Sequence, residues 1–135
     1  MSSRTLIGLD VGEKRIGVSV ANDGVLIAVP FATVEVDGSE IQTIAEIVIK
    51  ENADAIIVGY PRNQQGEATA QTKYVEAFAT RLEDLDKKII FQDESLTSVL
   101  AEQQLKAHNR PYAKGDIDAQ AATIILQDYL EQNHG

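Results

Sequence analysis

Near its start the chain carries Leu6-Ile7-Gly8-Leu9-Asp10-Val11-Gly12-Glu13-Lys14-Arg15-Ile16-Gly17-Val18-Ser19-Val20. The first half is apolar up to Asp10, and the second half alternates branched apolar residues with small ones, so the segment predicts two strands joined by a sharp reversal. A carboxylate at the end of a strand, followed by a glycine and by Lys14 and Arg15, suits a divalent metal beside a phosphate. A hairpin in which Asp10 only caps the turn is the alternative interpretation.

Length and composition limit the class of protein. At 135 residues without a visible linker, the chain is expected to form one domain, residues 1–135, with a core of ordinary size. It has no cysteine and only two histidines, so a metal site would need oxygen ligands, which Mg²⁺ and Mn²⁺ prefer. The sequence has neither a signal-like start nor an apolar run of about eighteen residues, and we therefore expect a cytoplasmic protein without a membrane span.

The charge distribution matters more than the net charge of −9. Such a balance argues against a surface that binds nucleic acid by electrostatic attraction alone. The segment 105–115, however, contains Lys106, Arg110 and Lys114 and no acid. One face could therefore bind a polyanion if metal ions mask the acids of the site.

Turn signals and hydrophobic spacing predict the order β-β-β-α-β-α-β-α-α. After the first hairpin we expect a strand over 25–36 that is an edge strand or contains a bulge because of Pro30. Ser39 and Gln42 predict a capping box for the next helix, and Asp116 predicts the cap of the last one. The remaining elements are strands at 55–59 and 88–92 and helices at 69–82, from residue 97 or 98 to about 109, and from 116 to about 132. This order describes a mixed five-stranded α/β sheet with helices on both faces.

Acids stand where the predicted strands end. Asp10 follows the first strand, Asp93 and Glu94 follow the fifth, and Asp118 lies at the start of the last helix. Carboxylates that converge on one point raise each other's pKa unless cations neutralise them. A divalent-metal site that activates water against a phosphodiester is the chemistry that such a cluster favours.

Four segments resemble one family. The pattern Gly8-x-Asp10-x-Gly12-x-Lys14-Arg15-x-Gly17-Val18 is similar to the opening motif of the YqgF family, small bacterial proteins related to the RuvC resolvases within the RNase H-like superfamily. Three later segments resemble family motifs in the same order: Ile57-Val58-Gly59-Tyr60-Pro61-Arg62-Asn63-x-x-Gly66, Asp93-Glu94-x-Leu96-Thr97 and Asp118-x-x-Ala121-Ala122. One departure is Ser95, which stands where the family usually has an arginine.

The resemblance implies a fold and a set of site residues. The fold is RNase H-like, with strand order 3-2-1-4-5 and the second strand antiparallel to the rest. The implied catalytic and metal-binding acids are Asp10, Glu94 and Asp118, with Asp93 as a further candidate ligand, and the implied cofactor is Mg²⁺, with Mn²⁺ as a substitute. The expected phosphate contacts are Lys14, Arg15, Arg62 and Lys114.

The resemblance also implies an activity: a nuclease, and so a hydrolase, that cleaves phosphodiester bonds in structured nucleic acid. Its substrate would be the precursor of 16S rRNA, processed at the 5′ end during ribosome biogenesis, or branched DNA such as a Holliday junction. A nucleic-acid-binding module that has lost activity is a rival, since Ser95 cannot supply the charge of an arginine. We expect a monomer or a homodimer, because cutting symmetric strands calls for two-fold symmetry whereas trimming one RNA end does not.

Overall fold

A five-stranded mixed sheet runs through the part of the chain that the computed structural model describes, residues 4–22, 24–61, 69–94, 103–107 and 114–133. Its strands are β1 (Thr5–Val11), β2 (Arg15–Asn22), β3 (Ile27–Glu35), β4 (Ala55–Pro61) and β5 (Lys88–Glu94), in the spatial order β3-β2-β1-β4-β5. β2 is antiparallel to β1 and β3, and β4 is parallel to β1 and β5. The predicted topology is therefore confirmed.

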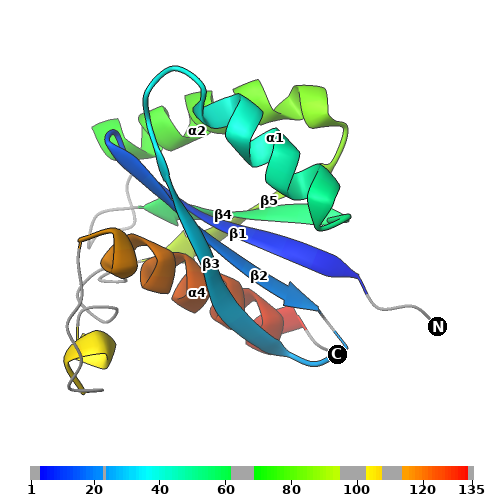
Figure 1. Ribbon diagram of the computed structural model, residues 1–135, viewed down its shortest axis with the longest axis vertical. Coiled ribbons are helices and arrows are strands. Elements are labelled where there is room, and N and C mark those ends of the chain that lie inside the picture. The colour runs from blue at the N-terminus through cyan, green and yellow to red at the C-terminus, as the bar shows by residue number, and fades with distance from the viewer. Residues whose placement is uncertain (1–3, 23, 62–68, 95–102, 108–113, 134–135) are drawn as a thin grey trace.

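Helices cover both faces of this sheet (Figure 1). α1 (Glu40–Lys50) and α2 (Ala70–Leu82), the latter extended by the short 3₁₀ turn η1 (Glu83–Leu85), lie on one face, and α4 (Lys114–Asn133) lies on the other. Residues 103–107 are also helical. The helix predicted to begin at Thr97 or Ser98 falls partly outside the described residues. No helix in the described ranges is long and apolar enough to span a membrane.

Strand alternation divides the core into two layers. On β1, Ile7 and Leu9 point into the layer beneath α1 and α2, whereas Leu6 belongs to the layer beneath α4. The layer beneath α4 also contains buried residues of the helix itself, among them Ile125 and Leu126. Successive side chains of a strand point to opposite faces, and here helices cover both faces. Side chains on both faces of β1 and β4 are therefore buried, which explains the near-continuous apolar runs of these strands.

β3 is the edge strand that Pro30 predicted. The register between β2 and β3 shifts between Val18 and Ser19, whose partners are Ala32 and Pro30, so that the intervening residue is the extra one of a β-bulge. Gln127 of α4 accepts a hydrogen bond from the amide of Ala28 at 2.9 Å. Proline and this side-chain partner leave the edge with fewer exposed backbone groups than a regular strand would have.

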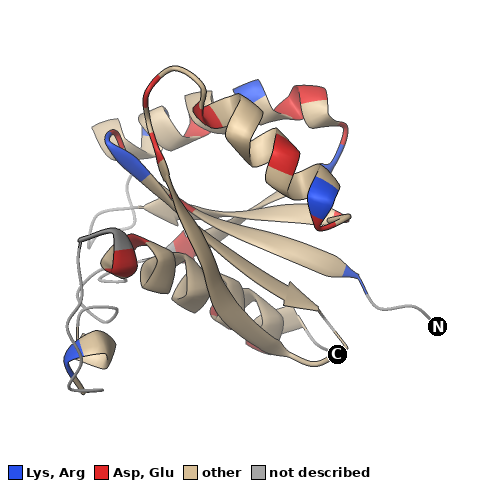
Figure 2. Ribbon diagram, in the orientation of Figure 1, with Lys and Arg blue, Asp and Glu red and all other residues tan. Residues whose placement is uncertain are grey.

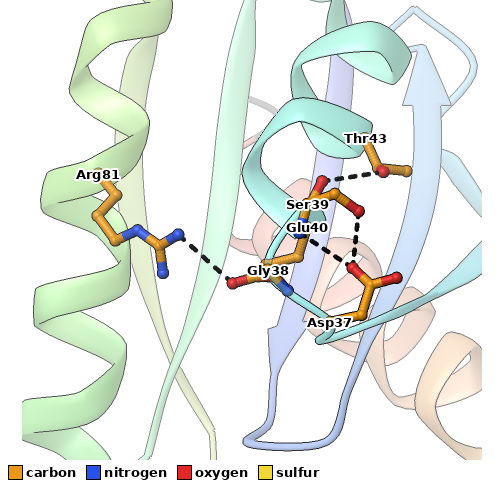
Figure 3. A network of polar contacts seen from close by, with 6 residues as sticks. All are labelled: Asp37, Gly38, Ser39, Glu40, Thr43 and Arg81. Atoms are coloured by element: carbon orange, nitrogen blue, oxygen red, sulfur yellow. Dashed lines mark hydrogen bonds and ion pairs between the residues drawn. The ribbon is translucent and has the colours of Figure 1, made fainter.

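The start of α1 differs from the predicted capping box. Ser39 is the N-cap residue, but its side chain caps no helix amide. Its hydroxyl donates instead to Oδ1 of Asp37 at 2.7 Å, and Oε1 of Glu40 accepts from the amide of Gly38 at 2.8 Å (Figure 3). The predicted Ser39–Gln42 box is wrong because the Ser39 hydroxyl bonds the carboxylate of Asp37 instead of a helix amide.

Two other helix starts test the predictions from spacing. α2 begins with a capping box between Thr69 and Thr72, in which each side chain bonds the other's backbone amide. α4 begins at Lys114, so Asp116 lies within the first turn instead of capping it. The cap assignment was wrong by two residues, although an acid in a first turn is still stabilised by the helix dipole.

Candidate active site

Asp10 lies near the end of β1 on the face that α4 covers. Leu6 packs in the core layer of α4, and alternation places Gly8 and Asp10 on the same face. Across the antiparallel pair Asp10 stands opposite Gly17 of β2. On the other side, Gly59 of β4 follows the partner of Leu9. The half-buried Asp10 thus has a glycine position on each neighbouring strand, where another backbone or a ligand can come close.

The first turn of α4 packs closely against β2 at Gly17, the cross-strand partner of Asp10. A Cβ built on Gly17 would lie 1.8 Å from the main-chain oxygen of Asp118, so only glycine permits this approach. One turn further on, the buried hydroxyl of Ser19 donates to the carbonyl oxygen of Ala122 at 2.8 Å. Directly opposed residues of antiparallel strands have Cβ atoms roughly 5 Å apart. Asp10 and Asp118, 108 positions apart in sequence (118 − 10), are therefore brought together at the end of β1.

An ion pair fixes the side chain of Asp118. Nε of Arg15 donates to Oδ2 of Asp118 at 2.7 Å, and the two side chains are 31% and 22% exposed. Arg15 stands opposite Glu35 of β3. The hydrogen bond and charge of Asp118, with a smaller contribution from Glu35, raise the pKa of Arg15 above its ordinary value. Arg15 is therefore a cation at every pH at which the site can work.

Backbone positions 93 and 94 of β5 alternate between the two faces of the sheet. Asp93 is exposed, pairs in register with Tyr60, and lines a surface pocket of about 510 Å³ at the edge of the sheet together with Glu76 of α2 and Gln132 of α4. Position 94 is in phase with Gln92, whose side-chain amide bonds Gln132 of α4 at 3.2 Å. The side chain of Glu94 lies outside the described part of the chain. β4 separates β1 from β5, so positions 10 and 94 are two strand spacings apart, roughly 10 Å between backbones.

The start of α2 anchors the same end of the sheet. Nε2 of Gln71 donates to the carbonyl oxygen of Val11, the residue after Asp10, at 3.0 Å. The hydroxyl of Thr72 donates to the carbonyl oxygen of Pro61 at the end of β4. Sequence reasoning assigned these polar side chains no role in the site. Their position just after a capping residue was the one available signal that they lie at a strand end.

The donor chemistry of the site fits a divalent metal. Asp10 and Asp118 both lie beside Gly17 on the face that α4 covers, and the backbone of position 94 is in phase with that face. Oxygen ligands of this kind suit Mg²⁺ or Mn²⁺. Within the described residues no group of three or more His, Cys, Asp and Glu side chains is arranged to hold a metal ion. A third carboxylate would therefore have to come from a side chain outside them.

The four residues predicted to contact phosphate lie in different environments or outside the described residues. Lys14 is exposed on the hairpin between β1 and β2, and Arg15 is paired with Asp118. Arg62 lies outside the described residues, and Lys114 is described only as the first backbone position of α4. Figure 2 places basic positions on the β1–β2 hairpin and acidic positions at the start of α4 on the same side of the molecule. Both signs of charge thus meet where β1 ends.

Comparisons with known proteins agree with this architecture. A family model described as "RuvX: Holliday junction resolvase" matches residues 4–132. A protein of Synechocystis sp. named "Putative pre-16S rRNA nuclease" is 46% identical over 131 residues, which cover 93% of this chain and 86% of that protein. A protein of the same name from Chloroflexus aurantiacus is 38% identical over 136 residues, covering 97% and 89%.

Two solved structures with a similar fold are Holliday junction resolvases. Thermus thermophilus RuvC in complex with a Holliday junction superposes with a TM-score of 0.57 at 16% identity, covering 97% of this chain and 96% of that one. The Holliday junction resolvase of fowlpox virus gives a TM-score of 0.57 at 16% identity, covering 95% and 99%. At this identity the likeness establishes the RNase H-like fold alone.

Proposed function

Because the chain belongs to the RuvX (YqgF) family, we propose that it is a divalent-metal-dependent nuclease that hydrolyses phosphodiester bonds in structured nucleic acid. The observation that supports the proposal is the close approach of Asp118, in the first turn of α4, to Gly17, the cross-strand partner of Asp10. These acids come from opposite ends of the chain. The close approach of α4 to β2 depends on a glycine, Gly17.

The metal ligands in this proposal are Asp10, Asp118 and Glu94, and the metal is Mg²⁺ with Mn²⁺ as a substitute. Glu94 is included because its backbone is in phase with Gln92, which contacts α4. Asp93 is left out because strand alternation turns position 93 to the face opposite that of Gln92. The reach of a glutamate side chain suits position 94, since β4 separates it from Asp10.

When bound, the metal supplies a Lewis acid that lowers the pKa of water and stabilises the leaving oxygen. The chain's own residues orient that chemistry. Asp10 is held between two glycine positions, Asp118 is fixed by Arg15 and by its backbone contact to Gly17, and Gln71 holds the carbonyl that follows Asp10. Lys14 provides an exposed cation for a phosphate beside the site, and we assign the same role to Arg62 and Lys114.

We propose pre-16S rRNA, processed at its 5′ end in the cytoplasm, as the substrate. Support comes from the relatives named as pre-16S rRNA nucleases, which reach 46% identity. A four-way DNA junction is the second candidate, supported by the family description and by the fold shared with junction resolvases. A single active unit suffices to trim one RNA end, whereas symmetric junction cleavage calls for a two-fold dimer.

Side-by-side cleavage tests both substrates. Purified protein with Mg²⁺ is offered a structured RNA carrying the 16S precursor 5′ end and a four-way DNA junction, together with the variants Asp10→Asn and Asp93→Asn. We expect cleavage of the RNA by the wild type and by Asp93→Asn, and none by Asp10→Asn. Cleavage of the junction alone would replace the RNA assignment, and undiminished cleavage by Asp10→Asn would exclude the mechanism. Absence of any wild-type cleavage, together with nucleic-acid binding, would favour a binding module.

A further inference from the structure

The role of Arg15 differs from the phosphate contact that the sequence predicts. We propose that Arg15 is a positioning residue that holds the carboxylate of Asp118 at the site, and that its charge is compensated by acids of this chain instead of by nucleic-acid phosphates. The inference rests on the proposed function, because it takes Asp118 to be a metal ligand.

Arg15, Gly17 and Ser19 form one row on β2 that faces α4. Each member holds a different part of the first turns of the helix. Arg15 bonds the side chain of Asp118, Gly17 admits its main-chain oxygen, and Ser19 bonds the carbonyl of Ala122. Asp118 is therefore fixed both through its backbone and through its side chain.

The charges around Arg15 also support compensation within the chain. Asp118 lies 2.7 Å from its Nε, and Glu35 is its cross-strand partner on β3. Lys14, the adjacent cation, is exposed on the hairpin, whereas the side chain of Arg15 is only 31% exposed. A guanidinium faced by two acids adds little net positive charge for a polyanion to meet.

The geometry of the pair is compatible with a metal ligand. The bond to Arg15 uses Oδ2 of Asp118. An ionised carboxylate accepts through both oxygens, so Oδ1 can serve a metal while Oδ2 keeps its partner. Hydrogen-bond partners that orient a metal ligand in this way typically contribute 10- to 100-fold, to order of magnitude, in metal affinity.

Two measurements separate positioning from phosphate binding. Mn²⁺ affinity is measured by isothermal titration calorimetry for the wild type, Arg15→Gln, Arg15→Lys and the neighbouring control Lys14→Gln. Affinity for a hairpin RNA is measured in EDTA over a series of salt concentrations for the same four proteins. Urea unfolding of each protein establishes that the variants are folded, which is expected because the pair is partly exposed and worth little to stability.

We expect Arg15→Gln to bind Mn²⁺ roughly 10- to 100-fold more weakly, and Arg15→Lys to recover part of that loss by restoring the charge. The salt slope of RNA binding should be unchanged in Arg15→Gln and should fall by about one in Lys14→Gln. Lys14→Gln should bind Mn²⁺ as the wild type does.

Each other outcome overturns the inference in a recognisable way. Wild-type Mn²⁺ affinity in Arg15→Gln would mean that Arg15 does not position a ligand. A salt slope of RNA binding that is lower by about one in Arg15→Gln would mean that Arg15 contacts a phosphate. If the wild type itself takes up no Mn²⁺, the proposed metal-dependent function fails first and the inference fails with it, which the wild-type titration alone reveals.

Discussion

The main-chain oxygen of Asp118 stands 1.8 Å from the point that a Cβ on Gly17 would occupy. α4 can lie this close to β2 only because residue 17 has no side chain. The contact sets where the first turn of α4 begins to cover the sheet, and with it the distance between Asp118 and Asp10.

Replacement of Gly17 by Ala should therefore push the start of α4 away from the sheet. Overpacking of a close contact costs about 1–3 kcal/mol, and we expect a loss of that size in the free energy of unfolding measured with urea. Val29→Ala on the exposed edge strand β3 is the control and should change stability by less than about 0.5 kcal/mol. A Gly17→Ala protein as stable as the wild type would contradict the close approach.

Asp10 and Asp93 provide a matched pair of strand-end acids on opposite faces. Asp10→Asn should abolish carboxylate-dependent Mn²⁺ uptake, because the metal loses a charged ligand, while leaving the urea midpoint near that of the wild type. Asp93→Asn should retain Mn²⁺ affinity within a few-fold, because position 93 alternates with Gln92, which lies against α4. Mn²⁺ affinity of both variants is measured by calorimetric titration. An equal loss of affinity in the two variants would refute the claim that Asp10, and not Asp93, is a metal ligand.

Asp118→Asn should release the charge of Arg15. The neutral amide no longer compensates the guanidinium, so one more cation can meet a phosphate. RNA binding in EDTA should then show a salt slope steeper by about one than in the wild type. The double variant Arg15→Gln/Asp118→Asn is the control and should return the slope to the wild-type value. The same slope in the single and double variants would show that Arg15 stays away from phosphates even when its partner is neutral.

Glu40 links the start of α1 to α2 and should make stability depend on acid. Its side chain is nearly buried and bonds the amide of Gly38 and, at 3.4 Å, Nη2 of Arg81 (Figure 3). Hydrogen bonds from the backbone amides of Glu40 and Gly38, with a smaller effect of Arg81, lower the pKa of Glu40. A lowered folded-state pKa stabilises the protein above the unfolded value, about 4.3, and this contribution is lost as the pH falls through the folded pKa.

Unfolding free energies of the wild type and Glu40→Gln, measured from neutral pH downward, test this dependence. At neutral pH the variant should be less stable by about 1 kcal/mol, the order of magnitude of one lost charged hydrogen bond. The difference should shrink as the pH falls below the unfolded value of about 4.3 and through the lower folded pKa of Glu40. Thr43→Ala, which removes a bond to Ser39 in the same network but keeps the carboxylate, should retain the acid-side loss. Parallel pH curves for the wild type and Glu40→Gln would contradict the prediction.

Local patterns in the sequence determined the elements of this fold and the position of Asp10 near the end of a strand. Alternation along β1 and β2, the proline in β3 and the helical spacing of α2 are interactions between neighbours in sequence, so residue types alone express them. The strand order came from the resemblance of four motifs to one family. Local signals were weakest at helix starts, where Asp37 rather than the helix amides engages Ser39 and where α4 begins two residues before Asp116.

Only the tertiary structure decided which residues meet at the site. Arg15 and Asp118 are separated by 103 positions, and no local pattern distinguishes a cation that pairs with a distant acid from one that awaits a phosphate. The small residues Gly17 and Ser19, two apart on β2, carried a hint that a helix approaches closely. Whether these small residues bring Asp118 to the site depends on where α4 lies. The position of α4 follows from the burial of two apolar layers against one sheet.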